Sequence, residues 1–438
     1  MRIETVYLRD FPPFDNAPLS FPVVDAPGKG ELHLFVGQNG TGKTRLLCLL
    51  AAAFGNRSEL DARTSAGSTV NCVVVCQFGE VSGVWGTKKN HCWWSASNHG
   101  DGVAQQLLRG ENAAGNPSPN LLAPSNRPKE AGWGTALAFR GTGRVSDAQI
   151  AAMNPVKVGE QPQWLSFDHV VDTDLVISQS MANIKIGAAM ESMSAPNGQP
   201  GRAMKIATRL EVAISQITGR SFYFVVDPMP KVALKVYWGG VPMMLKQLPD
   251  GLRSIIGWLV SCVAKMSAIH PEHEDPLSLP LILLLDEPES HLHPAWQRKV
   301  LPAALALFPH AQVFAATHSP FIISSANEGW IHILRANETT GIVTVDQPRP
   351  CLKGDTYLDV VEDVLGLTPL EAYDPETEQL LKQFQAIRDA VLGGNASEES
   401  KLNELAKTIA ERGDSLRDLV GRELHQLDRL MAQKRASA

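Results

Sequence analysis

The sequence has few cysteines, and none of them stands in a C-x-x-C pair. The 438 residues contain six: Cys48, Cys72, Cys76, Cys92, Cys262 and Cys351. Dispersed cysteines without paired spacing argue against a disulfide scaffold and are typical of buried thiols in a reducing compartment. The alternative is a zinc site that joins His91 to the thiols at positions 72, 76 and 92, although this spacing fits no common zinc motif.

Features of secretion and of membrane insertion are also missing. The opening stretch MRIETVYLRDF has no apolar segment of the kind that a signal peptide needs. No uninterrupted apolar run reaches about 18 residues, the length of a membrane-spanning helix. An excess of basic charge is absent too, because 40 Lys and Arg face 46 Asp and Glu. We therefore expect a cytoplasmic protein without a membrane partner that does not coat nucleic acid, with a local basic patch left open.

The composition is that of an ordinary globular protein, with 44% hydrophobic and 20% charged residues. The length allows two or three domains with substantial cores. Apolar periodicity predicts strands at residues 3–8, 31–37, 71–78, 135–144, 221–226, 279–286, 311–319, 330–336 and 341–347 and in a hairpin at 233–248. It predicts helices at residues 43–55, 175–193, 201–219, 251–266 and 297–308.

Two regions leave their role open. Residues 86–131 are rich in Gly, Asn, Ser and Pro, which predicts long surface loops, and loops of such length are often functional. From Thr356 onward the chain is mainly helical, with a break at Leu392–Ser400. The leucines and charges of this last region predict either an amphipathic cap on the body or a surface that docks a partner.

The segment Gly37–Thr44, GQNGTGKT, matches the phosphate-loop motif G-x-x-x-x-G-K-[ST] between a predicted strand and a predicted helix. Its glycines permit tight turns, and the N–H groups of the loop and of the helix N-terminus can cradle phosphates. We expect Lys43 to reach the β- and γ-phosphates and Thr44 to bind Mg²⁺. The expected nucleotide contacts in this segment are Gly37, Gln38, Asn39, Gly40, Thr41, Gly42, Lys43, Thr44 and Arg45.

An acid pair, Asp286-Glu287, ends the apolar strand that begins at Leu279. An acid in this place, beside a phosphate loop, is suited to hold Mg²⁺ directly or through water. The next carboxylate, Glu287, is placed to polarise an attacking water as general base. The sequence thus predicts an ATPase that converts ATP and water into ADP and phosphate, with Thr44 and Asp286 as the metal ligands.

The order of these motifs resembles the ABC-type ATPases of the RecF, SMC and OLD group. A phosphate loop is followed by a long insertion, the acid pair and a strand that ends at His318 in ATHSP. The resemblance implies an α/β fold: an ABC-type P-loop core with a mixed sheet, an inserted helical lobe between phosphate loop and acid pair, and a helical C-terminal region. The implied bounds are 1–145 and 278–348 for the core, 146–277 for the lobe and 349–438 for the C-terminal region. The resemblance also implies that His318 contacts the γ-phosphate and that Ser290–Pro294 crosses to a partner subunit.

The signature of ABC-type ATPases, approximately L-S-x-G-x, binds the γ-phosphate held by the opposite subunit. Here Leu248–Leu252, LPDGL, occupies its place, with Pro249 instead of the serine. Proline offers neither a hydroxyl nor an N–H, although the helix N-terminus remains and Arg253 could offset part of the loss. The stretch is either a helix start alone or, as we prefer, a phosphate site in which Asp250 and Gly251 serve a second protomer.

Two further parts of the family pattern have no clear counterpart. The glutamine that usually joins the core to the helical lobe is missing, and Arg140 or Arg144 is a candidate for that link. For adenine, the residues near the first strand are candidates, with core packing as the alternative role for each. They are Tyr7, Arg9 and Phe11.

The insertion lacks the long heptad arms of SMC-type clamps, and no nuclease signature follows His318. The runs LPDG and DEPESHLHP with the helical tail look most like bacterial anti-phage defence ATPases, such as the ATPase subunits of Septu, PARIS and some retron systems. This resemblance implies a homo-oligomer, at least a dimer, that senses phage or DNA and controls a separate nuclease or toxin. The alternatives are a RecF-like DNA-repair ATPase that acts on DNA and a nucleotide-binding switch with negligible turnover.

Overall fold

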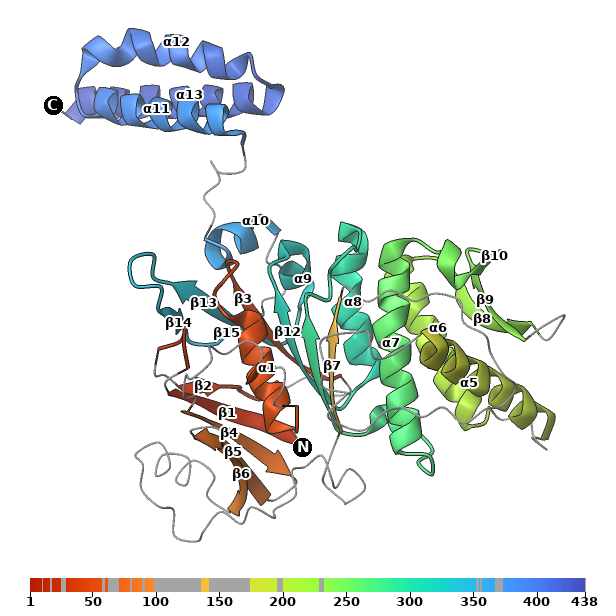
Figure 1. Cartoon of the computed structure of the whole chain (residues 1–438). Helices are drawn as coiled ribbons and strands as arrows, with labels where there is room; N and C mark the ends of the chain where they lie inside the picture. Colours follow the sequence, from red (N-terminus) through yellow and green to blue (C-terminus); the bar gives the residue numbers. More distant parts are fainter. Residues whose placement is uncertain are drawn as a thin grey trace. The chain divides into compact units, whose positions relative to one another are not determined.

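The computed structural model describes two compact units, Met1–Val360 and Val361–Ala438. The described residues are 1–9, 11–15, 18–24, 29–56, 60–61, 71–78, 81–88, 91–97, 135–141, 174–194, 200–227, 232–351, 354, 357–366 and 373–437. The first unit holds two large sheets with their helices, and the second holds helices only (Figure 1).

The larger sheet of the first unit is mixed, with seven strands among the described residues and the order β14-β13-β3-β12-β11-β7, in which β15 also pairs with β13. The strands are β3 (Glu31–Gly37), β7 (Thr135–Arg140), β11 (Leu281–Asp286), β12 (Ala311–Thr317), β13 (Trp330–Ala336), β14 (Val343–Val345) and β15 (Arg349–Pro350). The run from β13 to β7 is parallel, and only β14 and β15 are antiparallel to β13. Every residue of β11 is buried, as expected for a central parallel strand covered on both faces. The mixed sheet expected from the sequence is confirmed.

A second sheet is antiparallel, with the order β2-β1-β4-β5-β6. Its strands are β1 (Arg2–Arg9), β2 (Pro18–Ser20), β4 (Asn71–Phe78), β5 (Val81–Lys88) and β6 (His91–Ser97). The expectation of loops from Gly86 onward is therefore wrong for the end of β5 and for β6. The aromatic and β-branched residues of these segments favour strands, and the Gly- and Asn-rich composition of the longer stretch concealed them. Residues 98–131 lie outside the described residues.

Helix α1 (Lys43–Ala53) lies between the two sheets (Figure 1). Its side chains from Leu46 to Ala53 are all buried. They share one core with residues of both sheets, among them Val6 and Val74 of the antiparallel sheet and Leu284 of the parallel one. A helix covered on all sides is apolar all round, and this packing fixes the N-terminus of α1 rigidly.

Further helices and a three-stranded antiparallel sheet of order β10-β9-β8 follow in the first unit. They are α5 (Asp174–Ser194), α6 (Arg202–Thr218), β8 (Phe222–Asp227), β9 (Ala233–Trp238), β10 (Val241–Met244), α7 (Asp250–Ile269), α8 (Pro294–Leu307), α9 (Pro320–Ser325) and α10 (Tyr357–Asp359). Helix α7 has the length and the mean hydropathy, 1.4, of a membrane-spanning helix, but 83% of that window is buried inside the protein. It packs against α5, α6 and β7, so α7 is a core helix of this unit.

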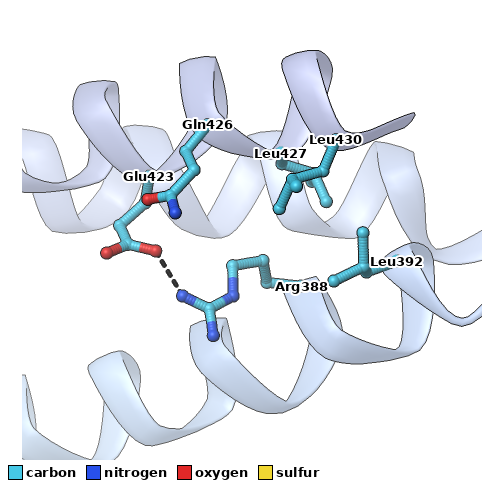
Figure 2. Close-up of a pocket in the computed structure, with 6 residues that line it drawn as sticks. All are labelled: Arg388, Leu392, Glu423, Gln426, Leu427 and Leu430. Carbon is cyan, nitrogen blue, oxygen red and sulfur yellow. Dashed lines mark hydrogen bonds and ion pairs between the residues drawn. The ribbon is translucent and has the colours of Figure 1, made fainter. Parts of the chain in front are cut away.

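The second unit contains α11 (Pro375–Leu392), α12 (Glu399–Ala410) and α13 (Asp414–Ser437). The helices bury their apolar faces against one another. Figure 2 shows the ion pair between Arg388 of α11 and Glu423 of α13 beside a small cavity of about 120 Å³. The helices predicted after Thr356 are confirmed, and their leucine pattern serves this internal core.

A side-chain amide joins the two sheets of the first unit. Gln312 of β12 accepts a hydrogen bond from the Ile3 N–H at 2.7 Å and donates one to the Ile3 carbonyl at 2.9 Å. Both bonds are buried, so the amide pairs with the backbone of β1 as a neighbouring strand would. The register of β1 against β4 shifts between Ile3 and Thr5, where this side-chain pairing occurs.

Two histidines are buried next to this amide. His33 Nδ1 lies 3.3 Å from His332 Nε2, and both side chains are almost fully buried beside Phe21. Burial lowers the pKa of both imidazoles, and the nearby His33 lowers the pKa of His332 further. Glu31, whose carboxylate lies 3.9 Å from His33 Nε2, opposes the effect on His33, whereas Arg2 adds to it.

Acid is therefore expected to destabilise the protein through this pair. Because the folded-state pKa values lie below the ordinary 6.5, the unfolded chain binds more protons, and stability present above pH 6.5 is lost as the pH falls. Each histidine contributes a slope of at most about 1.4 kcal/mol per pH unit. Urea denaturation of His332→Phe should show a flatter dependence of the free energy of unfolding on pH between about pH 7 and 5.

The control for this experiment is His425→Gln, because His425 is exposed on α13. Its pH dependence should match that of the wild type. Equal slopes for wild type and His332→Phe would show that the buried pair does not couple folding to protons.

Candidate active site

The carboxyl ends of four neighbouring parallel strands meet at one edge of the mixed sheet. The phosphate loop follows β3, His318 follows β12, Glu287 follows β11, and Arg140 ends β7. Strand β12 lies between β3 and β11, and Asp286 stands in register with Ala316 and Arg140. The edge where parallel strands end is where ligands bind in such sheets.

The phosphate loop has the backbone that the glycines predicted. Gly40 and Gly42 have φ angles of 85° and 88°, a region that favours glycine. A Cβ on Gly42 would also meet the Phe14 ring at 2.9 Å. Gln38, Asn39 and Gly40 are exposed, whereas Gly37 and Thr41 are buried. Helix α1 has no acid in its first turn, so the positive end of its dipole is available to an anion.

Lys43 folds back onto its own loop. Its ammonium donates to the carbonyls of Gly37 at 2.7 Å and of Gln38 at 3.0 Å, and only 7% of the residue is exposed. Burial lowers the pKa of Lys43, while the carboxylates of the acid-pair turn, Glu287 first, raise it. Phosphate oxygens are charged acceptors and hold an ammonium more strongly than carbonyls do. A triphosphate in the loop would therefore draw Lys43 away from these carbonyls.

Thr44 and Asp286 form the oxygen pair expected for a metal. The Thr44 hydroxyl donates to Asp286 Oδ1 at 2.8 Å, and Asp286 is only 3% exposed. Two hard oxygen ligands from the protein suit Mg²⁺. This ion usually takes one or two protein oxygens and completes its coordination shell with phosphate oxygens and water. Among the described residues, no group of three or more His, Cys, Asp or Glu side chains is arranged so that it could hold a metal ion. The side chains of His91 and Cys92, which the zinc alternative requires, lie outside them.

Glu287 stands in a strained turn. Its φ of 50° is uncommon for a residue with a Cβ and is frequent at functional sites. Glu287 Oε1 lies 3.9 Å from His318 Nδ1, and the Ser290 hydroxyl donates to Glu287 Oε2 at 3.4 Å. The side chains of Glu287 and His318 are 41% and 51% exposed. The pair is thus open to a water and to a phosphate at the same edge.

Comparisons with known proteins find similarity over the part of the chain that carries several of these residues. The family described as "AAA domain, putative AbiEii toxin, Type IV TA system" matches residues 192–324, a segment that contains α7, the acid pair and His318. The phosphate loop precedes it and completes the set at one sheet edge. Over residues 192–324 the chain is therefore similar to this family.

The similar proteins match this chain over only part of their length and part of its own. The Septu protein PtuA of Bacillus thuringiensis is 30% identical over 110 residues, which are 25% of this chain and 27% of that protein. The retron Vc95 probable ATPase of Vibrio cholerae serotype O1 biovar El Tor is 28% identical over 105 residues, 24% of this chain and 20% of that protein. The chain thus spans about a quarter of the length of these relatives. An SMC head domain from Thermotoga maritima superposes with a TM-score of 0.42 at 14% identity, over 79% of this chain and 99% of that one.

Glu289 is a residue of the candidate site that sequence reasoning missed. It is 6% exposed and accepts hydrogen bonds from the Thr317 hydroxyl and from the His318 N–H, the latter at 3.3 Å. Its other oxygen, Oε2, is buried and has no hydrogen-bond partner among the described residues. Burial raises the pKa of this carboxyl. Glu289 therefore ties the acid-pair turn to the strand end that carries His318, and its place in the run DEPES was the available sequence signal.

Gly251 packs against its own chain. A Cβ there would lie 2.6 Å from the His291 carbonyl oxygen, in the loop Ser290–Pro294, and His291 has a φ of 65°. Pro249 is the N-cap of α7, Asp250 lies in its first turn, and Arg253 Nη1 lies 3.3 Å from Asp250 Oδ1. The small size of Gly251 is thus already required within one protomer, whatever a second protomer adds.

Gly141 joins α7 to the acid pair. Its N–H donates to the Asp286 carbonyl at 3.0 Å, and its own carbonyl accepts a hydrogen bond from the Ser254 hydroxyl of α7. A Cβ on Gly141 would lie 1.9 Å from the Glu287 carbonyl oxygen, so only glycine fits. Helix α7 and the acid-pair turn are therefore in direct contact through this residue.

The remaining candidates differ in their surroundings. Phe11 is 1% exposed, stacks on Phe14 and lies 4.9 Å below the Arg45 guanidinium, so core packing describes Phe11 better than adenine binding. Tyr7 is half-buried and Arg9 is exposed on β1. Arg144, one of the two candidates for lobe coupling, lies outside the described residues.

Glu289→Gln is expected to stabilise the protein at neutral pH. The raised pKa of Glu289 means that burying the carboxyl costs free energy once it ionises. The contribution of this carboxyl to stability is therefore fully present below the unfolded pKa of about 4.3 and is lost as the pH rises. The amide keeps an acceptor for Thr317 and for the His318 N–H. The gain of Glu289→Gln over wild type, measured by chemical denaturation, should grow from near zero at about pH 4 towards neutral pH.

Glu289→Ala is the matched comparison, because it leaves both donors without an acceptor at a cost of about 1–3 kcal/mol. A deficit of Glu289→Gln that grows as the pH rises would show that the native state uses the carboxylate in its charged form.

Proposed function

We propose that the protein binds ATP with Mg²⁺ and hydrolyses it to ADP and phosphate. The observation that carries the proposal is the contact of Thr44 with Asp286 at 2.8 Å beside Lys43 and Glu287. The phosphate loop and Lys43 would hold the β- and γ-phosphates, and Thr44 and Asp286 would hold the metal. When bound, Mg²⁺ supplies positive charge that neutralises the phosphates.

Glu287 would accept the proton of the attacking water. A general base must lie within hydrogen-bond reach of the water, and the half-exposed Glu287 carboxylate at the open sheet edge meets this need. Ser290 and Gly141 hold the turn from two sides. His318, 3.9 Å from Glu287, would bind the γ-phosphate and orient the water between them.

A second protomer would complete the site. Glu287 and His318 are 41% and 51% exposed, so the phosphate side is not sealed by the protomer itself. The first N–H groups of α7 have no partner within the helix, and Arg253 lies in the same first turns. We propose that this helix end closes the site of a second copy in a head-to-tail pair. A variant of Arg253 tests the head-to-tail pair better than a variant of Gly251, because any side chain at Gly251 would collide with the His291 carbonyl of the same protomer.

A mixing experiment tests the shared site. Lys43→Ala should lose phosphate binding in its own site, and Arg253→Ala should lose the contact given to the partner, so each alone should release little phosphate. In a mixed pair one site contains Lys43 and Arg253 together. Equal mixing should therefore restore at most about a quarter of the wild-type rate, because half of the pairs are mixed and each has one complete site.

Phosphate release from the mixture, with ATP-dependent pairing followed by light scattering, is the measurement. If the mixture is as inactive as each variant while both variants fold, the head-to-tail pair is wrong. Full activity of Arg253→Ala alone would likewise show that α7 does not contribute to the site of the second protomer.

We further propose that the ATPase acts in the cytoplasm in anti-phage defence and regulates a separate effector, a nuclease or a toxin. Two kinds of support exist: the sequence run DEPESHLHP and the relatives named as Septu and retron proteins. The second unit, Val361–Ala438, is a candidate surface for the effector.

Expression of the gene with its natural neighbours should protect bacteria from phage, and Glu287→Gln should abolish the protection. Glu287→Gln retains the binding residues but lacks the base, so it should also trap the ATP-bound pair. Plating efficiency of a phage panel is the measurement, with Lys29→Gln as the control, because Lys29 is 55% exposed and lies outside the second unit. Unchanged plating, together with several-fold stimulation of phosphate release by DNA, would favour the DNA-repair alternative.

A further inference from the structure

Arg140 occupies the remaining oxygen of the metal-side carboxylate. Its Nε and Nη2 donate to Asp286 Oδ2 at 3.1 and 3.0 Å, while Thr44 takes Oδ1. Asp286 is 3% exposed, and the Arg140 side chain is 28% exposed. Both oxygens of the buried carboxylate are therefore engaged, one by a neutral donor and one by a cation.

A guanidinium differs from other donors in one respect that matters at a metal site. It has five N–H donors, no acceptor, and a charge that it keeps at every working pH. It therefore cannot become a metal ligand, and it repels a divalent cation that approaches the same carboxylate.

We propose that Arg140 and Mg²⁺ compete for Asp286, so that Arg140 holds the carboxylate before the nucleotide arrives and Mg²⁺ with nucleotide displaces it. The proposal rests on the proposed binding of Mg²⁺ and ATP. Arg140 then raises the concentration of Mg²⁺ needed for binding. It acts as a positioning residue and touches neither water nor the scissile bond.

The neighbour of Arg140 links this competition to α7. Gly141 bonds the Asp286 carbonyl through its N–H and the Ser254 hydroxyl through its carbonyl. A displacement of Arg140 from Asp286 therefore acts on a residue that α7 holds directly. Binding of the metal would therefore affect the N-terminal end of α7, which we propose closes the site of the second protomer.

The test is a Mg²⁺ titration of nucleotide binding, read by the fluorescence of mant-ATP without reference to turnover. In Arg140→Gln the Mg²⁺ concentration at half-maximal binding should fall about three- to tenfold, because a competing cation has been removed. Arg140→Lys keeps the charge but cannot bond in the bidentate manner, so its midpoint should lie between the two. Arg417→Gln, which removes an arginine that is 63% exposed on α13, should match the wild type.

A double variant separates competition from a general effect on the fold. In the Asp286→Asn background the carboxylate is gone, so adding Arg140→Gln should leave the midpoint unchanged. Without metal or nucleotide, Arg140→Gln should melt at a lower temperature than the wild type, and saturating Mg²⁺ with nucleotide should reduce that difference.

An unchanged or higher Mg²⁺ midpoint in Arg140→Gln, with nucleotide still bound by the wild type, overturns the competition and leaves the proposed function intact. Absence of mant-ATP binding by the folded wild type at any Mg²⁺ concentration overturns both. If Arg140→Gln does not fold, Arg140→Lys decides: a wild-type midpoint in that variant overturns the competition.

Discussion

The hydrogen bond between Thr44 and Asp286 joins residues that are 242 positions apart in the chain, and the site depends on it. It forms because β3 and β11 run parallel with only β12 between them, so that their carboxyl ends reach the same edge. Any shift of register would separate the phosphate loop from the acid pair. The buried helix α1, between two sheets, and the Gln312 amide, which holds β1 to β12, keep that register.

Close contact between backbones shapes the acid-pair turn at Glu287. Glu287 has a left-handed φ, and its carbonyl lies against Gly141 at a distance that admits no Cβ. Glu289, two residues on, then reaches Thr317 and the His318 N–H. The proposed general base, the proposed phosphate sensor and α7 are thus held together by one short turn.

The sequence predicted the parts of this site whose chemistry is local. The phosphate loop needs glycines and a lysine in fixed spacing, and the acid pair needs an apolar strand before it, so both were visible as motifs. Glu289 and Gly141 were missed because their roles depend on which strands become neighbours, and one sequence does not fix that order. Strand β6 was missed for a related reason, since its pairing with β5 outweighs the loop-like composition around it.

Gly251 has a packing role within one protomer that does not depend on the ABC signature. The chain lacks the serine of the ABC signature, yet the glycine is needed for contact with the His291 carbonyl within one protomer. A chain that functioned only as a monomer would still require that glycine. The presence of Gly251 is therefore no evidence by itself that two copies share a site, because one protomer already requires it.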